Sequence, residues 1–242
     1  MYWIRSLVNK NNLIPKSERS WILANMQRIF LSLILFGFFL SCSKSEIGGD
    51  KDKEVLELVR KFTNSKIEKF YIRSTEASPD GEEVLVPSPG ISVRMKEDEA
   101  LDLLGKLRPK LEEWKYTIFL TGYEAEFEGG NYNAFYRAVI VYKQDKYELL
   151  RKIGTAAPKY NIDTESIEKK FRQWEEKYSS MRFVIIDSDS ISALLVDPPK
   201  DVKRLAKEAY DFCPDAVEQN LGSLEEMEKM ILEDHLLPLW WD

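Results

Sequence analysis

The segment Asp211–Asp215, with the sequence DFCPD, holds a cysteine between two aspartates, which raises the question of nucleophilic chemistry. A nucleophilic cysteine needs a cation, a helix N-terminus or a histidine base beside it to lower its pKa. The flanking carboxylates would raise the pKa of Cys213 instead. The single histidine of the chain, His235, is the one candidate base. Because Cys213 also continues the apolar face of a helix predicted to begin near Val202, we expect a buried structural cysteine.

Aspartates in the C-terminal half offer a second kind of chemistry. The sequence DSDS starts at Asp187, but Pro198 occupies the position at which a calcium loop carries its bidentate glutamate, so the spacing favours a turn. A hydrolase that uses carboxylates such as Asp187, Asp215 or Asp242 stays open as an alternative, because acid pairs can converge in space without a sequence motif. CxxC pairs and the HExxH motif are absent from the sequence, so we expect no metal site and no cofactor.

The C-terminal sequence WWD gives the strongest indication of a binding surface. On a strand, Trp240 and Trp241 point to opposite faces, and the apolar Leu237 and Leu239 favour Trp241 as the inward ring. Trp240 is then expected to be partly exposed, and tryptophan is enriched in binding hot spots. The alternative is that both rings close the core at the edge of a sheet. The candidate binding surface comprises Tyr160, Asn161, Asp187, Asp215, Gln219, Trp240 and Asp242.

The start of the chain predicts its location. Ile29–Leu40 reads IFLSLILFGFFL, an uncharged apolar run that is shorter than the roughly 20 residues of a spanning helix and fits the core of a signal peptide. The residues just before Cys42 resemble the lipobox of bacterial lipoproteins. That resemblance implies that residues 1–41 form a signal peptide and that Cys42 carries a lipid. Met26 is an alternative start, and a buried apolar helix is the alternative reading of the run.

This interpretation predicts a lipid-anchored protein on the extracytoplasmic side of the cell envelope. Without residues 1–42, the chain keeps 30 basic and 40 acidic side chains, a net charge of −10. Because the backbone of a nucleic acid would repel such a surface, we expect no nucleic-acid partner. The expected partners are the membrane, through the N-terminal lipid, and an unknown protein or small ligand.

The remaining chain shows alternating helical and strand patterns. Residues 42–52 are polar and contain glycine, as is typical of a flexible tether. We expect an N-terminal α/β part over residues 53–133 and a C-terminal domain over residues 134–242. A buried strand is predicted at Ala134–Tyr142 and a helix near Lys146–Ile153. The order of patterns predicts an α+β fold with a mostly antiparallel sheet and helices on one face, a ferredoxin-like core being one possibility.

Helix start signals support this assignment in the C-terminal half. Asp163 or Thr164 can cap one helix and Asp201 a second one. Ser223 and Glu226 form a capping box for the last helix, after which LLPLWW reads as a final strand.

The segments YNIDTESI, WEEKY, PPKDVKRLAKEAYDFCPDAVEQ and LWWD together resemble a bacterial family, number 4253 of the domains of unknown function, from about Ala134 to Asp242. This resemblance implies a fold and a coherent surface, but no established reaction, substrate or cofactor. The positions that match the family pattern are Tyr160, Asn161, Trp174, Asp187, Phe212, Cys213, Pro214, Asp215, Gln219, Gly222, Trp240, Trp241 and Asp242.

The function predicted from these observations is the binding of a protein or small ligand without chemistry of its own. An immunity-like protein that neutralises a basic toxin is one form of this hypothesis. The alternative is the carboxylate-dependent hydrolase described above.

Overall fold

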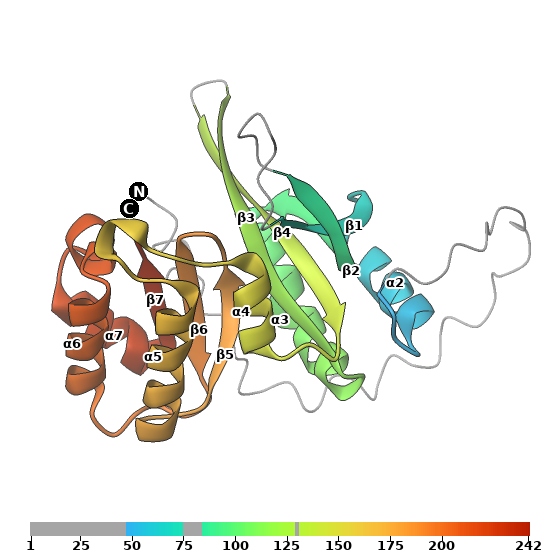
Figure 1. Cartoon of the computed structure of the whole chain (residues 1–242). Coiled ribbons are helices and arrows are strands. Elements are labelled where there is room, and N and C mark those ends of the chain that lie inside the picture. The colour runs from blue at the N-terminus through green and yellow to red at the C-terminus, as the bar shows by residue number, and fades with distance from the viewer. Residues whose placement is uncertain (1–46, 75–83, 129–130) are drawn as a thin grey trace, which may run out of the picture.

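The computed structural model describes residues 47–74, 84–128 and 131–242, which form one sheet with helices packed around it (Figure 1). The apolar run Ile29–Leu40, the alternative start Met26 and the lipidation candidate Cys42 lie outside the described residues.

Seven strands form a single sheet in the order β1-β2-β4-β3-β5-β6-β7. Neighbouring strands are antiparallel except β3 and β5, which pair in parallel through Leu120 and Ile185. The α+β class and the mostly antiparallel sheet are therefore confirmed. The strands are β1 (Ile67–Arg73), β2 (Leu85–Lys96), β3 (Tyr116–Glu128), β4 (Asn131–Tyr142), β5 (Met181–Ile186), β6 (Ser190–Leu195) and β7 (Leu236–Trp240).

A ferredoxin-like core is only partly formed. The unit of β2, helix α3 (Glu97–Glu113), β3 and β4 has the split β-α-β arrangement, because β4 lies between β2 and β3. In a complete ferredoxin-like sheet the strand after the second helix would lie beside β2. Here β1 occupies that place, and β5 pairs with β3 instead.

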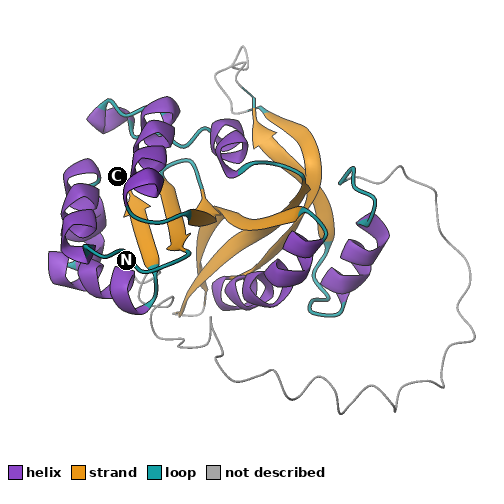
Figure 2. Ribbon diagram, turned by 90° about the horizontal axis from the view of Figure 1, so that it is seen from below, coloured by secondary structure: helices purple, strands orange, loops and turns teal. Residues whose placement is uncertain are grey.

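Helices cover both faces of the sheet, so the expectation of helices on one face is wrong (Figure 2). On β4, Val139 and Val141 belong to one apolar cluster, whereas Ala138 and Ile140 belong to a second one. Because neighbouring residues of a strand point to opposite faces, these clusters lie on opposite sides of the sheet. The uninterrupted apolar run AVIVY is the sequence signal for burial on both faces.

Each face of the sheet has its own helices. Helices α2 and α3 contribute to the cluster that holds Ile140, and α4, α5 and α6 contribute to the cluster that holds Val139. Helix α7 packs against α6 and β7. The bounds are α2 (Asp52–Arg60), α4 (Lys146–Ile153), α5 (Thr164–Lys177), α6 (Val202–Phe212) and α7 (Leu224–Glu233).

The predicted helix starts are confirmed by side-chain caps. The carboxylates of Asp163 and Asp201 accept hydrogen bonds from backbone N–H groups of the first turns of α5 and α6. The hydroxyl of Ser223 accepts from the backbone N–H of Glu226 at the start of α7. Such caps satisfy donors that have no partner inside the helix.

The end of the predicted tether is part of the folded body. Ile47 is 2% exposed, and Asp52 is 5% exposed at the first position of α2. The Asp52 carboxylate accepts a hydrogen bond of 2.7 Å from the hydroxyl of Tyr116 and bonds from the backbone N–H groups of Gly48 and Gly49. A tether that reaches residue 52 is therefore wrong, because this carboxylate fixes residues 47–52 to the start of β3.

Candidate functional site

Four residues of the predicted binding surface meet at the carboxylate of Asp215. Its Oδ1 accepts hydrogen bonds from the hydroxyl of Tyr160 at 2.6 Å and from the amide of Gln219 at 2.9 Å. Its Oδ2 accepts from the backbone N–H of Asp242 at 3.0 Å. We call these four residues the Asp215 cluster.

The Asp215 cluster connects three distant segments of the chain. Tyr160 ends the 3-10 turn Pro158–Tyr160, Gln219 lies in the π-helical turn Ala216–Leu221, and Asp242 follows β7. Burial acts to raise the pKa of Asp215, but the three hydrogen bonds outweigh it and hold the pKa below its usual value. A buried carboxylate with this set of donors holds the structure together rather than exchanging protons.

The two C-terminal tryptophans differ in burial, as the strand alternation predicts. Trp241 is 2% exposed, and its indole N–H donates to the carbonyl of Phe212 at 3.4 Å. Trp240 is partly exposed at the end of β7. The inward position of Trp241, with Leu237 and Leu239 fully buried beside it, is confirmed.

Cys213 is buried, as predicted. Its thiol donates to the carbonyl of Trp240 at 3.0 Å, and burial raises its pKa to about 12. Within the described residues no hydrogen bond joins His235 to Cys213, and the thiol is engaged by the carbonyl of Trp240 instead. This cysteine therefore lacks the surroundings that would activate a nucleophile.

Asp187 lies apart from the Asp215 cluster, whereas Asn161 follows Tyr160 directly but makes no hydrogen bond to Asp215 among the described residues. Asn161 is exposed, with a left-handed backbone at φ 55°, directly after the 3-10 turn. Asp187 follows β5, and its Oδ2 accepts from the backbone N–H of Tyr123 at 2.8 Å, while Oδ1 accepts from Ser188 at 2.8 Å. The structure thus divides the predicted surface into two places.

Asp187 lines a cleft of about 330 Å³ that we call the charged cleft. One wall is the edge strand β1, and the opposite wall comprises β3, the end of α4 and the residues after β5. The cleft is lined by Glu68, Lys69, Phe70, Tyr71, Ile72, Arg73, Leu85, Ser92, Thr121, Gly122, Arg137, Ile153, Asp187 and Ser188.

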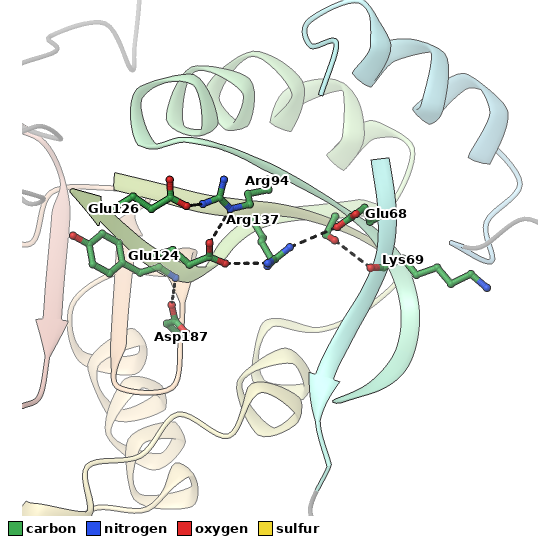
Figure 3. Close-up of polar contacts among 9 residues, drawn as sticks. Glu68, Lys69, Arg94, Glu124, Glu126, Arg137 and Asp187 are labelled. Atoms are coloured by element: carbon green, nitrogen blue, oxygen red, sulfur yellow. Dashed lines mark hydrogen bonds and ion pairs between the residues drawn. The ribbon is translucent and has the colours of Figure 1, made fainter. Parts of the chain in front are cut away.

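A bulge in β3 shapes this cleft. The register of β3 against β4 shifts between Thr121 and Glu124, and Gly122 adopts a left-handed φ of +64°, which a side chain would disfavour. The bulge turns the backbone N–H of Tyr123 toward Asp187 (Figure 3). The cleft therefore lies beside the bulge in the middle of β3 and just after the carboxyl end of β5.

A row of alternating charges extends from the charged cleft across four strands (Figure 3). Glu124 accepts from Arg94 at 2.8 Å and from Arg137 at 2.9 Å, and Arg137 also lies 3.7 Å from Glu68. Arg94 in turn pairs with Glu126. Burial acts to raise the pKa of Glu124, but the two arginines outweigh it and lower the pKa.

Sequence reasoning missed Arg137 and its partners. They lie on β1, β2, β3 and β4, and only the order of the strands brings them together. The one local signal is an arginine inside the apolar strand AFYRAVIVY, where a charge needs a partner or access to water.

The described residues contain no group of three or more histidine, cysteine, aspartate or glutamate side chains that could hold a metal ion. In the same part of the chain, no helix has the length and apolar character needed to cross a membrane.

The fold and the cleft define an α+β protein. Its candidate binding site lies where the parallel pair of strands, β3 and β5, joins the antiparallel part of the sheet. Residues 137–242 match the family described as "Domain of unknown function (DUF4253)", which confirms the resemblance found in the sequence. The match begins at Arg137 within β4 and includes the Asp215 cluster and Asp187, whereas β1 lies outside it. The comparisons found no match among curated proteins or solved structures.

Proposed function

We propose that this protein is a lipid-anchored binding protein of the bacterial cell envelope and that the charged cleft holds its ligand. The observation that carries this proposal is a cleft with apolar walls whose lining includes both the positively charged Arg137 and the negatively charged Asp187. Specific small-molecule sites combine a mainly apolar lining with a few polar groups that fix the orientation of the ligand.

The lining indicates the kind of ligand. Phe70, Ile72 and Ile153 offer an apolar wall, while the side chain of Arg137 is 36% exposed and its guanidinium can donate to an acceptor. A volume of about 330 Å³ falls at the lower end of the range for small-molecule pockets. A compact ligand with one apolar side and at least one hydrogen-bond acceptor suits this arrangement.

The envelope location rests on the sequence of the N-terminal segment. The apolar run Ile29–Leu40 followed by Cys42 is typical of an exported lipoprotein. The acidic balance of the remaining chain is also compatible with the immunity-like form of the hypothesis, in which the partner is a basic protein.

A carboxylate-dependent hydrolase is the second candidate. The surrounding protein and the charge of Asp187 raise the pKa of Asp189, which is the direction that a general acid requires, although its side chain is exposed. Against this role, both oxygens of Asp187 accept backbone N–H bonds, and the carboxylate of Asp215 is held by the hydrogen bonds of its cluster. The third candidate, Asp242, is exposed. Hydrolytic turnover that is lost in Asp189→Asn would favour this alternative over binding alone.

Native mass spectrometry tests the binding proposal. The full chain, purified from its own envelopes without denaturation, should carry a small molecule that unfolding releases. Ser188→Trp places a large ring at the mouth of the charged cleft and should abolish the adduct, whereas the exposed control Lys110→Gln on α3 should retain it. A wild-type chain without an adduct, or an adduct unchanged in Ser188→Trp, would contradict the proposal.

A further inference from the structure

A second cleft lies at the opposite end of the parallel strands β3 and β5. It has a volume of about 340 Å³ and is lined by the first residues of both strands together with parts of α3 and α4. We call it the Arg108 cleft. The residues that matter for its chemistry are Arg108, Gln144, Lys146, Arg182 and Phe183.

Arg108 is a cation without an anionic partner. Among the described residues it makes no ion pair, and its guanidinium donates one long hydrogen bond of 3.5 Å to the carbonyl of Phe183. Burial lowers its pKa to about 10, although the nearby Glu112 acts in the opposite direction. A charge that is withdrawn from water without a partner is costly, and such a charge marks a place where an anion can bind.

The side-chain amide of Gln144 is a second group in the same cleft that lacks a hydrogen-bond partner. Its Oε1 is buried and has no hydrogen-bond partner, whereas its backbone carbonyl accepts from the hydroxyl of Thr117 at 3.3 Å. A glutamine amide can present either its oxygen or its NH₂ group to a ligand. Gln144 can therefore complete the binding of a polar group held by Arg108.

The other charges of the Arg108 cleft already have partners. Lys146 pairs with Glu175 and donates to the carbonyl of Met181 at 2.7 Å. Arg182 lies 3.5 Å from Glu112. The Asp145 carboxylate caps α4 by accepting from two backbone N–H groups. Arg108 is therefore the one cation of this lining that makes no ion pair among the described residues.

We propose that the Arg108 cleft binds a small monocarboxylate. The guanidinium of Arg108 holds the carboxylate through charge-assisted hydrogen bonds. Gln144 donates to one of its oxygens once its amide is flipped, so that the NH₂ group takes the position of the unpartnered Oε1. The carboxylates of Glu112 and Asp145 also line the cleft and would repel a phosphate dianion more strongly than a monoanion. Ile118 and Phe183 offer apolar surface to the body of the ligand.

Saturation-transfer NMR with the full chain tests this site, with benzoate as the probe and benzamide as its uncharged match. Benzoate should bind saturably and about tenfold or more tightly than benzamide. Arg108→Gln should weaken benzoate binding about tenfold, because it removes the charge-assisted bonds. The control Lys110→Gln removes an exposed lysine of the same helix that pairs with Glu113, and it should bind like the wild type.

Equal binding of benzoate and benzamide by the wild type would overturn the proposal. So would benzoate binding that is unchanged in a folded Arg108→Gln protein. If that variant does not fold, Arg108→Lys replaces it. Lysine keeps the positive charge but lacks the planar guanidinium that donates two parallel hydrogen bonds to a carboxylate. Arg108→Lys should therefore bind benzoate more weakly than the wild type. This test does not involve the charged cleft, so its result does not bear on the ligand proposed for that cleft.

Discussion

At the scale of single residues, Asp215 is the most connected group of the C-terminal half. Its carboxylate receives one hydrogen bond from each of three segments, through Tyr160, Gln219 and Asp242. The family match covers all four residues. We infer that the FCPD and WWD sequences depend on each other. The carboxylate of Asp215 in FCPD holds the backbone N–H of Asp242 in WWD.

Asp215→Asn should destabilise the fold by about 1–3 kcal/mol at pH 7, the usual range for hydrogen bonds to a charged group. The reason is that an amide NH₂ in place of Oδ2 would face the N–H of Asp242, so that two donors would meet. Urea unfolding followed by circular dichroism measures the loss. The control Asp211→Asn changes an exposed carboxylate paired with Lys207 and should cost less than about 0.5 kcal/mol.

The stability lost in Asp215→Asn should depend on pH. The pKa of Asp215 is lower in the folded protein than its usual value, so its contribution is complete above the unfolded pKa of about 4 and is lost as pH falls through the folded pKa. The stability difference between the wild type and Asp215→Asn should therefore shrink in acid, below pH about 4. A difference that stays constant down to pH about 2 would show that the charge of Asp215 is not the cause.

Cys213 should react slowly with an aromatic disulfide reagent at pH 8 in the native protein. Burial raises its pKa to about 12, and its thiol is engaged by the carbonyl of Trp240. Peptide mass spectrometry separates its labelling from that of Cys42. Unfolding in urea should make labelling fast, and fast labelling without urea would contradict the buried position.

At the scale of elements, β7 is the strand at one edge of the sheet. The rings of Trp240 and Trp241 at its end lie in different surroundings. Trp241→Ala should cost about 3–5 kcal/mol, because the ring is fully packed and meets Phe212 at a centroid distance of 5.8 Å. Trp240→Ala should cost clearly less, because its ring is partly exposed. Chemical unfolding of both variants compares them directly, and equal losses would mean that both rings belong to the core.

Local sequence signals predicted many elements well. The caps of α5, α6 and α7 were predicted, because a cap and the first turn of its helix are neighbours in the sequence. The cap of α4, Asp145, was not. The bounds of α4 agree with the prediction at Lys146–Ile153. The two-sided burial of β4 was missed, although its unbroken apolar run is typical of a strand covered on both faces.

The candidate site, too, could be predicted from the sequence only in part. Tyr160, Asp215, Gln219 and Asp242 lie within the residues that match the family model, and they lie together in the structure. The charged cleft could not be predicted, because its walls come from β1, β3, β4 and the end of β5. Their proximity depends on the strand order and on the bulge at Gly122, which no local pattern specifies.

At the scale of the whole molecule, the proposed lipid anchor predicts where the protein is found. Wild-type protein should enter the detergent phase of a phase-separation assay, because lipid attached to Cys42 adds a large apolar group. Cys42→Ala should leave the chain uncleaved or soluble. Cys213→Ala is the matched control and should partition like the wild type, whereas equal partitioning of Cys42→Ala and wild type would contradict the anchor.

Hydrogen–deuterium exchange tests most directly whether the charged cleft is the ligand site. The full chain as purified from envelopes is compared with the same chain after unfolding, dialysis and refolding to remove bound molecules. We predict slower exchange in the untreated protein for β1, for residues 121–123 and for residues 187–188, because a ligand would shield the walls of the cleft. Identical exchange in these segments, or protection confined to other parts of the chain, would contradict the account.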